Sequence, residues 1–292
     1  MKRLALLFLF LCGSVSLAAD RRIAFERDDA VYVGNLEATL VRKLSDGVFP
    51  AISPDAQKVV FSNVESTPAR YRRRIGIIDT ISGKFALLEN IPSDNSYQAR
   101  WSPNGDWIAF VLQSGGQLRL GRVKPDGTGF SFIGNARSNE APFYSPCWAA
   151  DGASLYCQDT ANIYLVALDG SVRKTWAIDK IAPGGAMSAD ARIDLSPDGR
   201  HLLLSIDMDE EYDRKNWDGP VPALWSFDPE TEIGVRLSSK NLFAWDGSWL
   251  DNANILFVSQ PAGETIASIY RTNGKNLKRL IENARRPSVS RP

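Results

Sequence analysis

Residues 101–110 are Trp-Ser-Pro-Asn-Gly-Asp-Trp-Ile-Ala-Phe, which is an aromatic residue, a Ser-Pro-Asn-Gly turn and an apolar run. Pro and Asn suit the two right-handed helical positions of a type I turn, and Gly suits the left-handed position that follows. The phrase therefore predicts a tight hairpin between two β-strands. Related phrases, each with an apolar or aromatic residue, a turn and an apolar run, occur at residues 52–61, 148–157, 195–204 and 249–258.

The repeat has a regular length. When the five phrases are aligned on the Ser position, the anchors are Ser53, Ser102, Ala149, Ser196 and Leu250, at spacings of 49, 47, 47 and 54 residues. Each repeat also holds a second turn before another apolar stretch, at residues 77–83, 123–127, 166–170, 226–230 and 270–274. Repeats of this length with four short strands each are typical of β-propeller blades.

The two ends of the repeat array complement each other. Residues 23–46 match the second, third and fourth strands of a blade, and residues 287–290 match a first strand. Pairing them predicts an all-β fold, a six-bladed β-propeller whose last blade is closed by the N-terminal strands (23–46) plus the C-terminal strand (287–290). An open sandwich array or a solenoid is the alternative, but it leaves the missing strand at one end and the surplus strand at the other unexplained.

The first residues have the layout of a secretory signal peptide. Lys2 and Arg3 precede an apolar run at residues 4–11, and Ser16-Leu17-Ala18 forms a small-x-small cleavage site. The run is too short for a transmembrane helix, which needs about 20 residues. We therefore expect a cleaved signal peptide at residues 1–18, a single propeller domain at residues 19–292, and a periplasmic address. Lipid attachment at Cys12 is disfavoured because Leu precedes it where lipoprotein signals place a small residue.

The charge balance argues against one class of partner. The sequence has 34 Lys and Arg and 34 Asp and Glu, and residues 1–18 hold two of the basic side chains and no acidic one, which leaves the mature chain at a formal charge of −2. Nucleic-acid binding rests on a strong positive surface, so we expect no nucleic-acid partner.

The repeat resembles that of a known family. The copies at residues 101–110 and 195–204 resemble the WD40-like repeat of TolB-like propellers, and the resemblance covers residues 23–290. TolB is periplasmic, binds the lipoprotein Pal and works in the Tol–Pal system, so the resemblance implies a periplasmic protein-binding role. TolB also has an N-terminal α/β domain, whereas the strands predicted here begin directly after the cleavage site, so we expect a TolB-like propeller without that domain. Prolyl-oligopeptidase-type peptidases and oligogalacturonate lyases carry the same repeat, so function must come from the site.

The sequence is poor in catalytic groups. His201 is its one histidine, whereas the lyases rely on several for metal binding, and we expect it to lie at a strand end without a catalytic role. No Gly-x-Ser-x-Gly motif is present. We therefore expect a monomeric, non-catalytic module that binds an envelope or periplasmic protein. The alternative is an enzyme, or a small-ligand or glycan binder, that works in the channel of the same propeller.

Two charged segments define the predicted partner face. A basic run contains Arg70, Arg72, Arg73 and Arg74, and an acidic loop three blades away contains Asp209, Glu211, Asp213 and Trp217. Both segments join the second and third strands of their blades, so they are expected on one face at opposite rims, where such charge orients a partner. Trp245, before a first strand, is a further aromatic candidate. Two unrelated solvated loops are the alternative.

The acidic loop is also the best metal candidate. Asp207, Asp209, Glu211 and Asp213 occupy alternate positions along it, and their carboxylates could converge on a calcium ion. A solvated loop is the preferred interpretation because the Gly that calcium loops place at a sharp turn is missing. No other cofactor is expected.

First strands line the channel of a propeller. Two residues before each anchor lie Ala51, Arg100, Cys147, Asp194, Ser248 and Ser288. Arg100 and Asp194 are the two charged members, and they could hold a ligand or pair across the channel.

Cysteine and tryptophan give two further predictions. Cys147 and Cys157 lie on adjacent strands of one hairpin with matching parity, so a disulfide is predicted in an oxidising compartment, with two buried thiols as the alternative. Trp101, Trp148 and Trp249 share one repeat position with apolar residues, so they are predicted to pack between blades.

Overall fold

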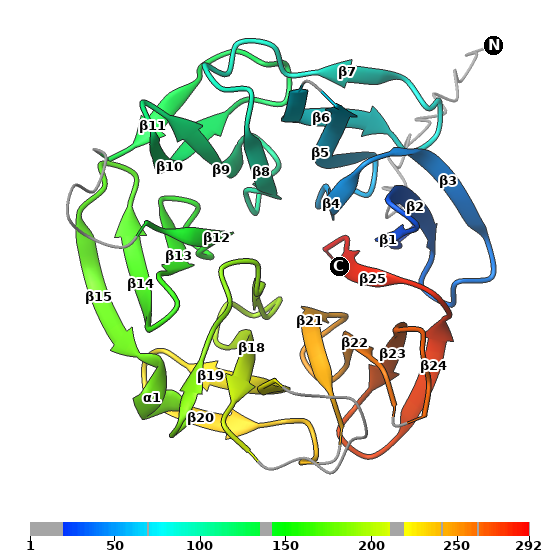
Figure 1. Cartoon of the computed structure of the whole chain (residues 1–292), viewed down its shortest axis with the longest axis vertical. Coiled ribbons are helices and arrows are strands. Elements are labelled where there is room, and N and C mark those ends of the chain that lie inside the picture. The colour runs from blue at the N-terminus through cyan, green and yellow to red at the C-terminus, as the bar shows by residue number, and fades with distance from the viewer. Residues whose placement is uncertain are drawn as a thin grey trace, which may run out of the picture.

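The computed structural model describes residues 20–68, 70–134, 142–210, 219–240, 242–261 and 263–291. These residues form six antiparallel sheets arranged around a central axis, with the C-terminus beside the first strands of the chain (Figure 1). The blade that holds both chain ends is called the seam blade. Its strands, from the axis outward, are β25 (Arg285–Val289), β1 (Arg22–Arg27), β2 (Ala30–Asn35) and β3 (Val41–Asp46).

The other blades are numbered 2 to 6 in chain order. Blade 2 consists of β4 (Val48–Ile52), β5 (Lys58–Thr67), β6 (Arg70–Asp79) and β7 (Phe85–Leu87). Blade 3 consists of β8 (Ser96–Trp101), β9 (Ile108–Ser114), β10 (Gln117–Val123) and β11 (Ser131–Ile133). Blade 4 consists of β12 (Tyr144–Trp148), β13 (Ser154–Gln158), β14 (Asn162–Ala167) and β15 (Val172–Ala177), and the short helix α1 (Ile178–Ile181) follows it. Blade 5 consists of β16 (Gly185–Ala186), β17 (Ile193–Leu195), β18 (Leu202–Met208), β19 (Val221–Asp228) and β20 (Ile233–Arg236). Blade 6 consists of β21 (Ala244–Trp249), β22 (Ile255–Ser259), β23 (Ser268–Thr272) and β24 (Leu277–Ile281).

The anchor serine organises the predicted hairpin. The Ser102 amide donates to the Trp107 carbonyl at 2.8 Å, and the Trp107 amide donates to Ser102 Oγ at 2.9 Å. Between them the Gly105 amide donates to the Ser102 carbonyl, and Gly105 has a φ of +77°. That left-handed conformation is the one that the Ser-Pro-Asn-Gly sequence predicts.

The connections divide the ring into two faces. Turns between the first and second strands and between the third and fourth strands lie on one face, which is called the turn face. Loops between the second and third strands, and the connections from one blade to the next, lie on the other, which is called the loop face. Each first strand therefore runs from the loop face to the turn face along the channel.

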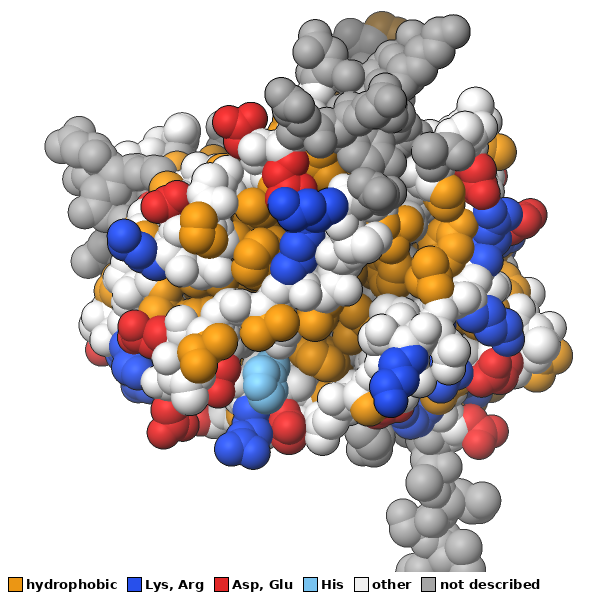
Figure 2. All heavy atoms as spheres, turned by 90° about the horizontal axis from the view of Figure 1, so that it is seen from below, with side chains coloured by type: hydrophobic (Ala, Val, Ile, Leu, Met, Phe, Trp, Pro, Cys, Tyr) orange, Lys and Arg blue, Asp and Glu red, His pale blue; other side chains and the backbone are white. Residues whose placement is uncertain are grey.

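The core lies between blades rather than at the axis. Six clusters of buried apolar side chains occur in the described residues, and each joins two neighbouring blades. Trp148 is buried in one of them, and Trp101 and Trp249 pack against two others, as predicted. Figure 2 shows part of the outer rim, where hydrophobic side chains gather in a band between charged residues on either side.

The seam blade closes the ring as predicted. β25 pairs antiparallel with β1, and Ile23 lies opposite Val289 and Ala24 opposite Ser288. The Ser290 amide donates to the Arg22 carbonyl at 3.0 Å, and the Arg22 amide donates to Ser290 Oγ at 2.9 Å. This is the bonding of the Ser102 turn, reproduced between two ends of the chain.

The predicted disulfide is wrong. Cys147 and Cys157 are both buried and are not bonded to each other. In the observed register Cys147 lies opposite Tyr156, so Cys157, one residue further on, points to the other side of the sheet. Cys147 packs toward blade 5 and Cys157 toward blade 3. The prediction assumed a turn that places both cysteines on one face of the hairpin. The observed turn shifts the pairing of the two strands by one residue, so the cysteines lie on opposite faces.

Candidate functional site

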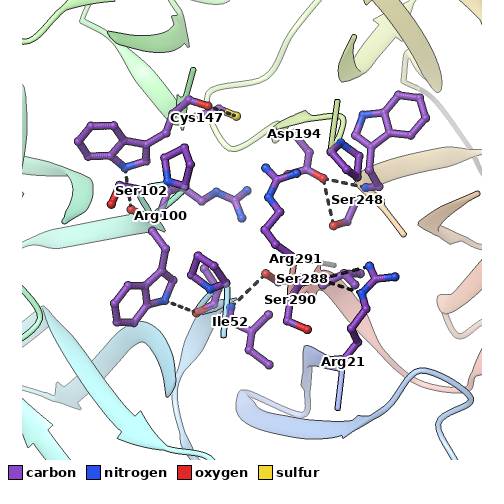
Figure 3. A pocket seen from close by; sticks show the side chains of 18 residues that line it. Arg21, Ile52, Arg100, Ser102, Cys147, Asp194, Ser248, Ser288, Ser290 and Arg291 are labelled. Atoms are coloured by element: carbon purple, nitrogen blue, oxygen red, sulfur yellow. Dashed lines mark hydrogen bonds between the residues drawn. The ribbon is translucent and has the colours of Figure 1, made fainter. Parts of the chain in front are cut away.

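A cavity of about 60 Å³ opens into the channel from the turn face (Figure 3). All six residues predicted at the position two before the anchor line it: Ala51, Arg100, Cys147, Asp194, Ser248 and Ser288. Arg21 and Arg291, which the sequence reasoning did not include, line it as well. They come from the seam, where the first and the last described segments of the chain meet beside the axis.

Arg100 and Asp194 lie in this cavity without forming an ion pair in the described structure. Asp194 Oδ2 accepts hydrogen bonds from the Trp249 amide at 2.7 Å and from Ser248 Oγ at 3.2 Å. The Arg100 guanidinium points into the middle of the opening, and no described residue forms a hydrogen bond or ion pair with it (Figure 3). Burial lowers the pKa of Arg100, which Asp194 partly offsets.

A second ring of residues lies two positions closer to the loop face. It consists of the residues four before each anchor, which are Phe49, Gln98, Ser145, Arg192, Asp246 and Arg286. All of them except Arg192 have positive φ angles, between 51° and 56°, and the ladder register shifts at this point in their strands. Such bulges redirect side chains, at a cost of about 1–3 kcal/mol for each left-handed non-glycine residue.

The sequence reasoning missed this second ring. Its first ring came from counting two residues back from each anchor, and a further step of two along the same strands reaches the second. That step would have added three charged residues, Arg192, Asp246 and Arg286, to the candidate channel site. The bulge itself has no recognisable sequence signature here because five different residue types adopt it.

The charged residues of the second ring are buried. Arg192 is 5% exposed, and burial together with the nearby Arg100 lowers its pKa to about 9. Burial raises the pKa of Asp246, against the effects of Arg286 and Arg192. Burial opposes the charge of Arg286, but the carboxylates of Asp246 and Glu26 outweigh it and raise its pKa. Glu26, which is 1% exposed, accepts two hydrogen bonds from Arg286 Nη1 at 3.0 Å.

The predicted basic run lies on the loop face, in a hairpin longer than the others. β5 and β6 each have ten residues, and Arg70, Arg72, Arg73 and Arg74 lie in β6. Much of their charge is locally balanced: Arg70 and Arg72 pair with Asp94, and Arg74 pairs with Glu65. Arg73 instead lies over the Tyr97 ring, 3.8 Å from its centroid. Four arginines against two carboxylates leave the hairpin with a net positive charge.

The acidic loop is only partly described. Glu211, Asp213 and Trp217 lie outside the described residues, so the acidic half of the predicted partner face stays a prediction. Asp209 follows β18, and Asp207 lies in that strand, where burial raises the pKa of its carboxyl. Across the described ranges no group of three or more His, Cys, Asp or Glu is arranged to hold a metal ion. The calcium prediction, which needs Asp213, is not tested by those ranges.

The prediction for Trp245 needs a correction. This residue lies within β21 rather than before it, and it packs against the cluster of buried residues between blade 6 and the seam blade. Its ring therefore contributes to the core and is not an unpartnered aromatic anchor.

Comparison with known proteins supports the fold. TolB from Acinetobacter baumannii superimposes with a TM-score of 0.68 at 16% sequence identity, over 94% of this chain and 68% of that one. A TolB candidate from Agrobacterium tumefaciens gives a TM-score of 0.62 at 14% identity, over 90% of this chain and 89% of that one. The chain has a TolB-like propeller fold.

The TolB-like fold is shared with proteins that perform chemistry. An oligogalacturonate lyase in complex with manganese matches with a TM-score of 0.54 at 15% identity, over 87% of this chain and 70% of that one. A puromycin-hydrolyzing peptidase from Mycobacterium tuberculosis matches with a TM-score of 0.57 at 17% identity, over 90% of this chain and 42% of that one. No protein-family model and no curated protein sequence matches the chain. Likeness at these identities establishes the fold and leaves the function to the site.

No helix among the described residues is long and apolar enough to span a membrane.

Proposed function

We propose that this chain is an exported, non-catalytic binding module that holds a periplasmic or envelope protein on its loop face. The observation that carries the proposal is the long β5–β6 hairpin, whose tip presents Tyr71 at 60% exposure beside arginines. Tyr and Arg are the residue types that most often supply binding energy at the centre of a protein interface.

Side-chain contacts fix the conformation of the β5–β6 hairpin in the absence of a partner. The Arg73 Nε donates to Asn95 Oδ1 at 2.8 Å, and Arg70 reaches Asp94 at 2.7 Å, which ties β6 to the connection between blades 2 and 3. A preorganised surface loses less side-chain entropy when it binds. Its net positive charge favours an acidic patch on the partner and predicts binding that weakens as salt increases.

The chemistry of the channel supports a role without catalysis. Burial, with Asp194 nearby, raises the pKa of the Cys147 thiol to about 12, which leaves no thiolate to act as a nucleophile at neutral pH. Asp194 is already occupied by Ser248 and Trp249. The His201 backbone takes part in the Ser196 turn.

The test compares two exposed residues at opposite ends of β6. Tyr71→Ala changes the loop face, and Ile81→Ala, at a residue 71% exposed in the turn after β6, changes the turn face. Tagged wild type and both variants are used to recover partners from an envelope extract, with quantitative mass spectrometry at low and high salt. We expect partners that are lost with Tyr71→Ala, retained with Ile81→Ala and weakened by salt. Equal recovery by all three proteins would refute the loop face as the binding surface.

One observation favours a second candidate function, a channel site for a small ligand. Arg100 points into the turn-face cavity and has no partner among the described residues, so it is available to bind a carboxylate or another anionic group. A thermal-shift screen of small acids and sugars on wild type and Arg100→Gln tests this candidate. A ligand that stabilises only the wild type supports it, and a screen without such a ligand counts against it.

A further inference from the structure

A second, smaller cavity lies in the channel on the loop-face side of Arg100. Eight residues line it: Phe49, Pro50, Gln98, Ala99, Arg100, Ser145, Arg192 and Arg286. Three of them carry a guanidinium group and none carries a carboxylate. Its volume of about 10 Å³ is close to the space that one water-sized species occupies. The channel therefore contains a small, positively charged chamber.

Several donors around this cavity have no hydrogen-bond partner in the described part of the chain. They are Nε and Nη2 of Arg192, Nε of Arg286 and the hydroxyl of Ser145. Arg192 and Ser145 are each 5% exposed, so bulk water does not reach them freely. A buried donor without a partner costs about 1–3 kcal/mol, and more when it carries charge. Four such donors around one cavity indicate that an acceptor belongs there.

The protein's own acidic groups do not supply that acceptor. Asp194 bonds to Ser248 and Trp249, and Glu26 is bound by Arg286 and by the Phe49 amide at 3.1 Å. Asp246 is buried nearby but does not line the cavity. The third nitrogen of Arg192, Nη1, donates to the Pro287 carbonyl, which holds the guanidinium against the seam and leaves its other two nitrogens available.

We propose that this chamber is a binding site for a single small anion of about the size of chloride, held by Arg100, Arg192 and Ser145. Of the common anions, a monatomic one comes closest to this volume, and it accepts from several donors at once without a fixed geometry. Its single negative charge also offsets part of the positive charge of the three arginines. Because Arg192 also contacts β25, the bound anion would stabilise the closed seam. This site goes beyond the proposed partner binding and requires no partner protein.

The experiment measures the dependence of thermal stability on chloride. The protein is unfolded in sodium gluconate and in increasing sodium chloride at constant ionic strength. We expect Tm to rise and then saturate, by about 5 °C or more at chloride concentrations a hundredfold above Kd. Arg100→Met and Ser145→Ala should reduce the rise, and they remain informative even if Arg192→Met does not fold. Arg173→Met is the matched control, because Arg173 lies on the outer strand β15, away from the channel.

Crystals soaked in bromide locate the anion directly. We expect an anomalous peak between Arg100, Arg192 and Ser145 in the wild type, and none there in Arg100→Met. A chloride response that is absent, or equal in Arg100→Met, Ser145→Ala and Arg173→Met, would overturn the proposal. So would bromide peaks confined to the protein surface, which would mean that water alone fills the chamber.

Discussion

The seam blade and blade 3 have the same strand order from the axis outward but differ in how the first two strands are connected. In blade 3, β8 continues through the Ser102 turn into β9, and turn and strands follow each other in the chain. In the seam blade, β25 and β1 make the corresponding bonds through Ser290 and Arg22, more than 260 residues apart. The comparison shows that the hydrogen bonds of a blade do not require chain continuity. The seam must, however, overcome the entropy of closing the whole chain.

Contacts of charged side chains at the seam offset this entropic cost of closure. Arg286 bonds to the buried Glu26, Arg21 bonds to the Ser290 and Leu250 carbonyls, and Arg27 bonds to the Asn283 carbonyl at 3.1 Å. In the Ser102 turn of blade 3 no arginine takes part: Ser102 Oγ bonds to Asn104 and to the Trp107 amide, and the one charged group is the Asp106 carboxylate, which accepts from Asn104. Charge-assisted hydrogen bonds are roughly twice as strong as neutral ones. The arginine contacts therefore stabilise the pairing of β25 with β1. In the other blades a short turn holds the corresponding two strands together.

Removal of the C-terminal strand should have the largest effect. A chain that ends at Arg286 loses the Ala24–Ser288 and Ile23–Val289 pairs and both Ser290 bonds, and it exposes the edge of β1. We expect a loss of about 5 kcal/mol or more, which lowers Tm by about 10 °C or more, and association of the open edges. Differential scanning calorimetry with size-exclusion chromatography measures both. A chain that ends at Arg291 is the control, and an unchanged Tm in the shorter chain would show that the seam is dispensable.

Neutralising the buried seam acid should have the next largest effect. Glu26→Gln keeps the shape of the side chain but removes the buried one of the two carboxylates that pair with Arg286, the other being the exposed Asp190, and a broken buried pair costs about 3–5 kcal/mol. Glu264→Gln is the control, because its partner Arg279 lies at the surface of blade 6 and the pair contributes little. Chemical denaturation gives both free energies of unfolding. Equal losses in the two variants would mean that the seam pair has no special role.

Engineered disulfides between the first two strands of the seam blade and of blade 2 compare how much each closure contributes to stability. Ala24→Cys with Ser288→Cys crosslinks the seam, and Ala51→Cys with Val60→Cys crosslinks blade 2 at the same repeat position. In the chain-entropy model the seam bond, which closes a loop of roughly 260 residues, should stabilise by about 3 kcal/mol more than the other. The measurement is the difference in Tm between the oxidised and reduced forms of each variant. A larger gain in blade 2 would contradict the comparison.

The sequence repeat made the fold predictable. Parts of the candidate site could not be predicted, because they depend on local departures from the repeat. The Ser-Pro-Asn-Gly phrase and its spacing were enough for the six blades, the seam and the first ring around the channel. The second ring was missed because backbone bulges at Gln98 and Ser145 carry no common residue type. The charges of Arg70 and Arg72 were visible in the sequence, but their partner Asp94 comes from a connection between blades that periodicity does not place. Side-chain partners across blades depend on tertiary geometry, and a single sequence does not contain it.

The smallest effect on Tm should come from reducing agents, because no disulfide bond joins the described strands. Cys147 and Cys157 face different blades, and burial holds the pKa of Cys147 at about 12, which leaves about one thiolate in ten thousand at pH 8. We expect the same Tm with and without dithiothreitol. We also expect no reaction of either thiol with an aromatic disulfide reagent until the chain is unfolded, when both react. A lower Tm in reductant would instead support the predicted Cys147–Cys157 disulfide. Blade 4 would then be crosslinked by a covalent bond that the seam blade lacks. If both thiols stay protected while Glu26→Gln destabilises the protein, the ring is closed without a disulfide, by arginine contacts, backbone hydrogen bonds and apolar packing between blades.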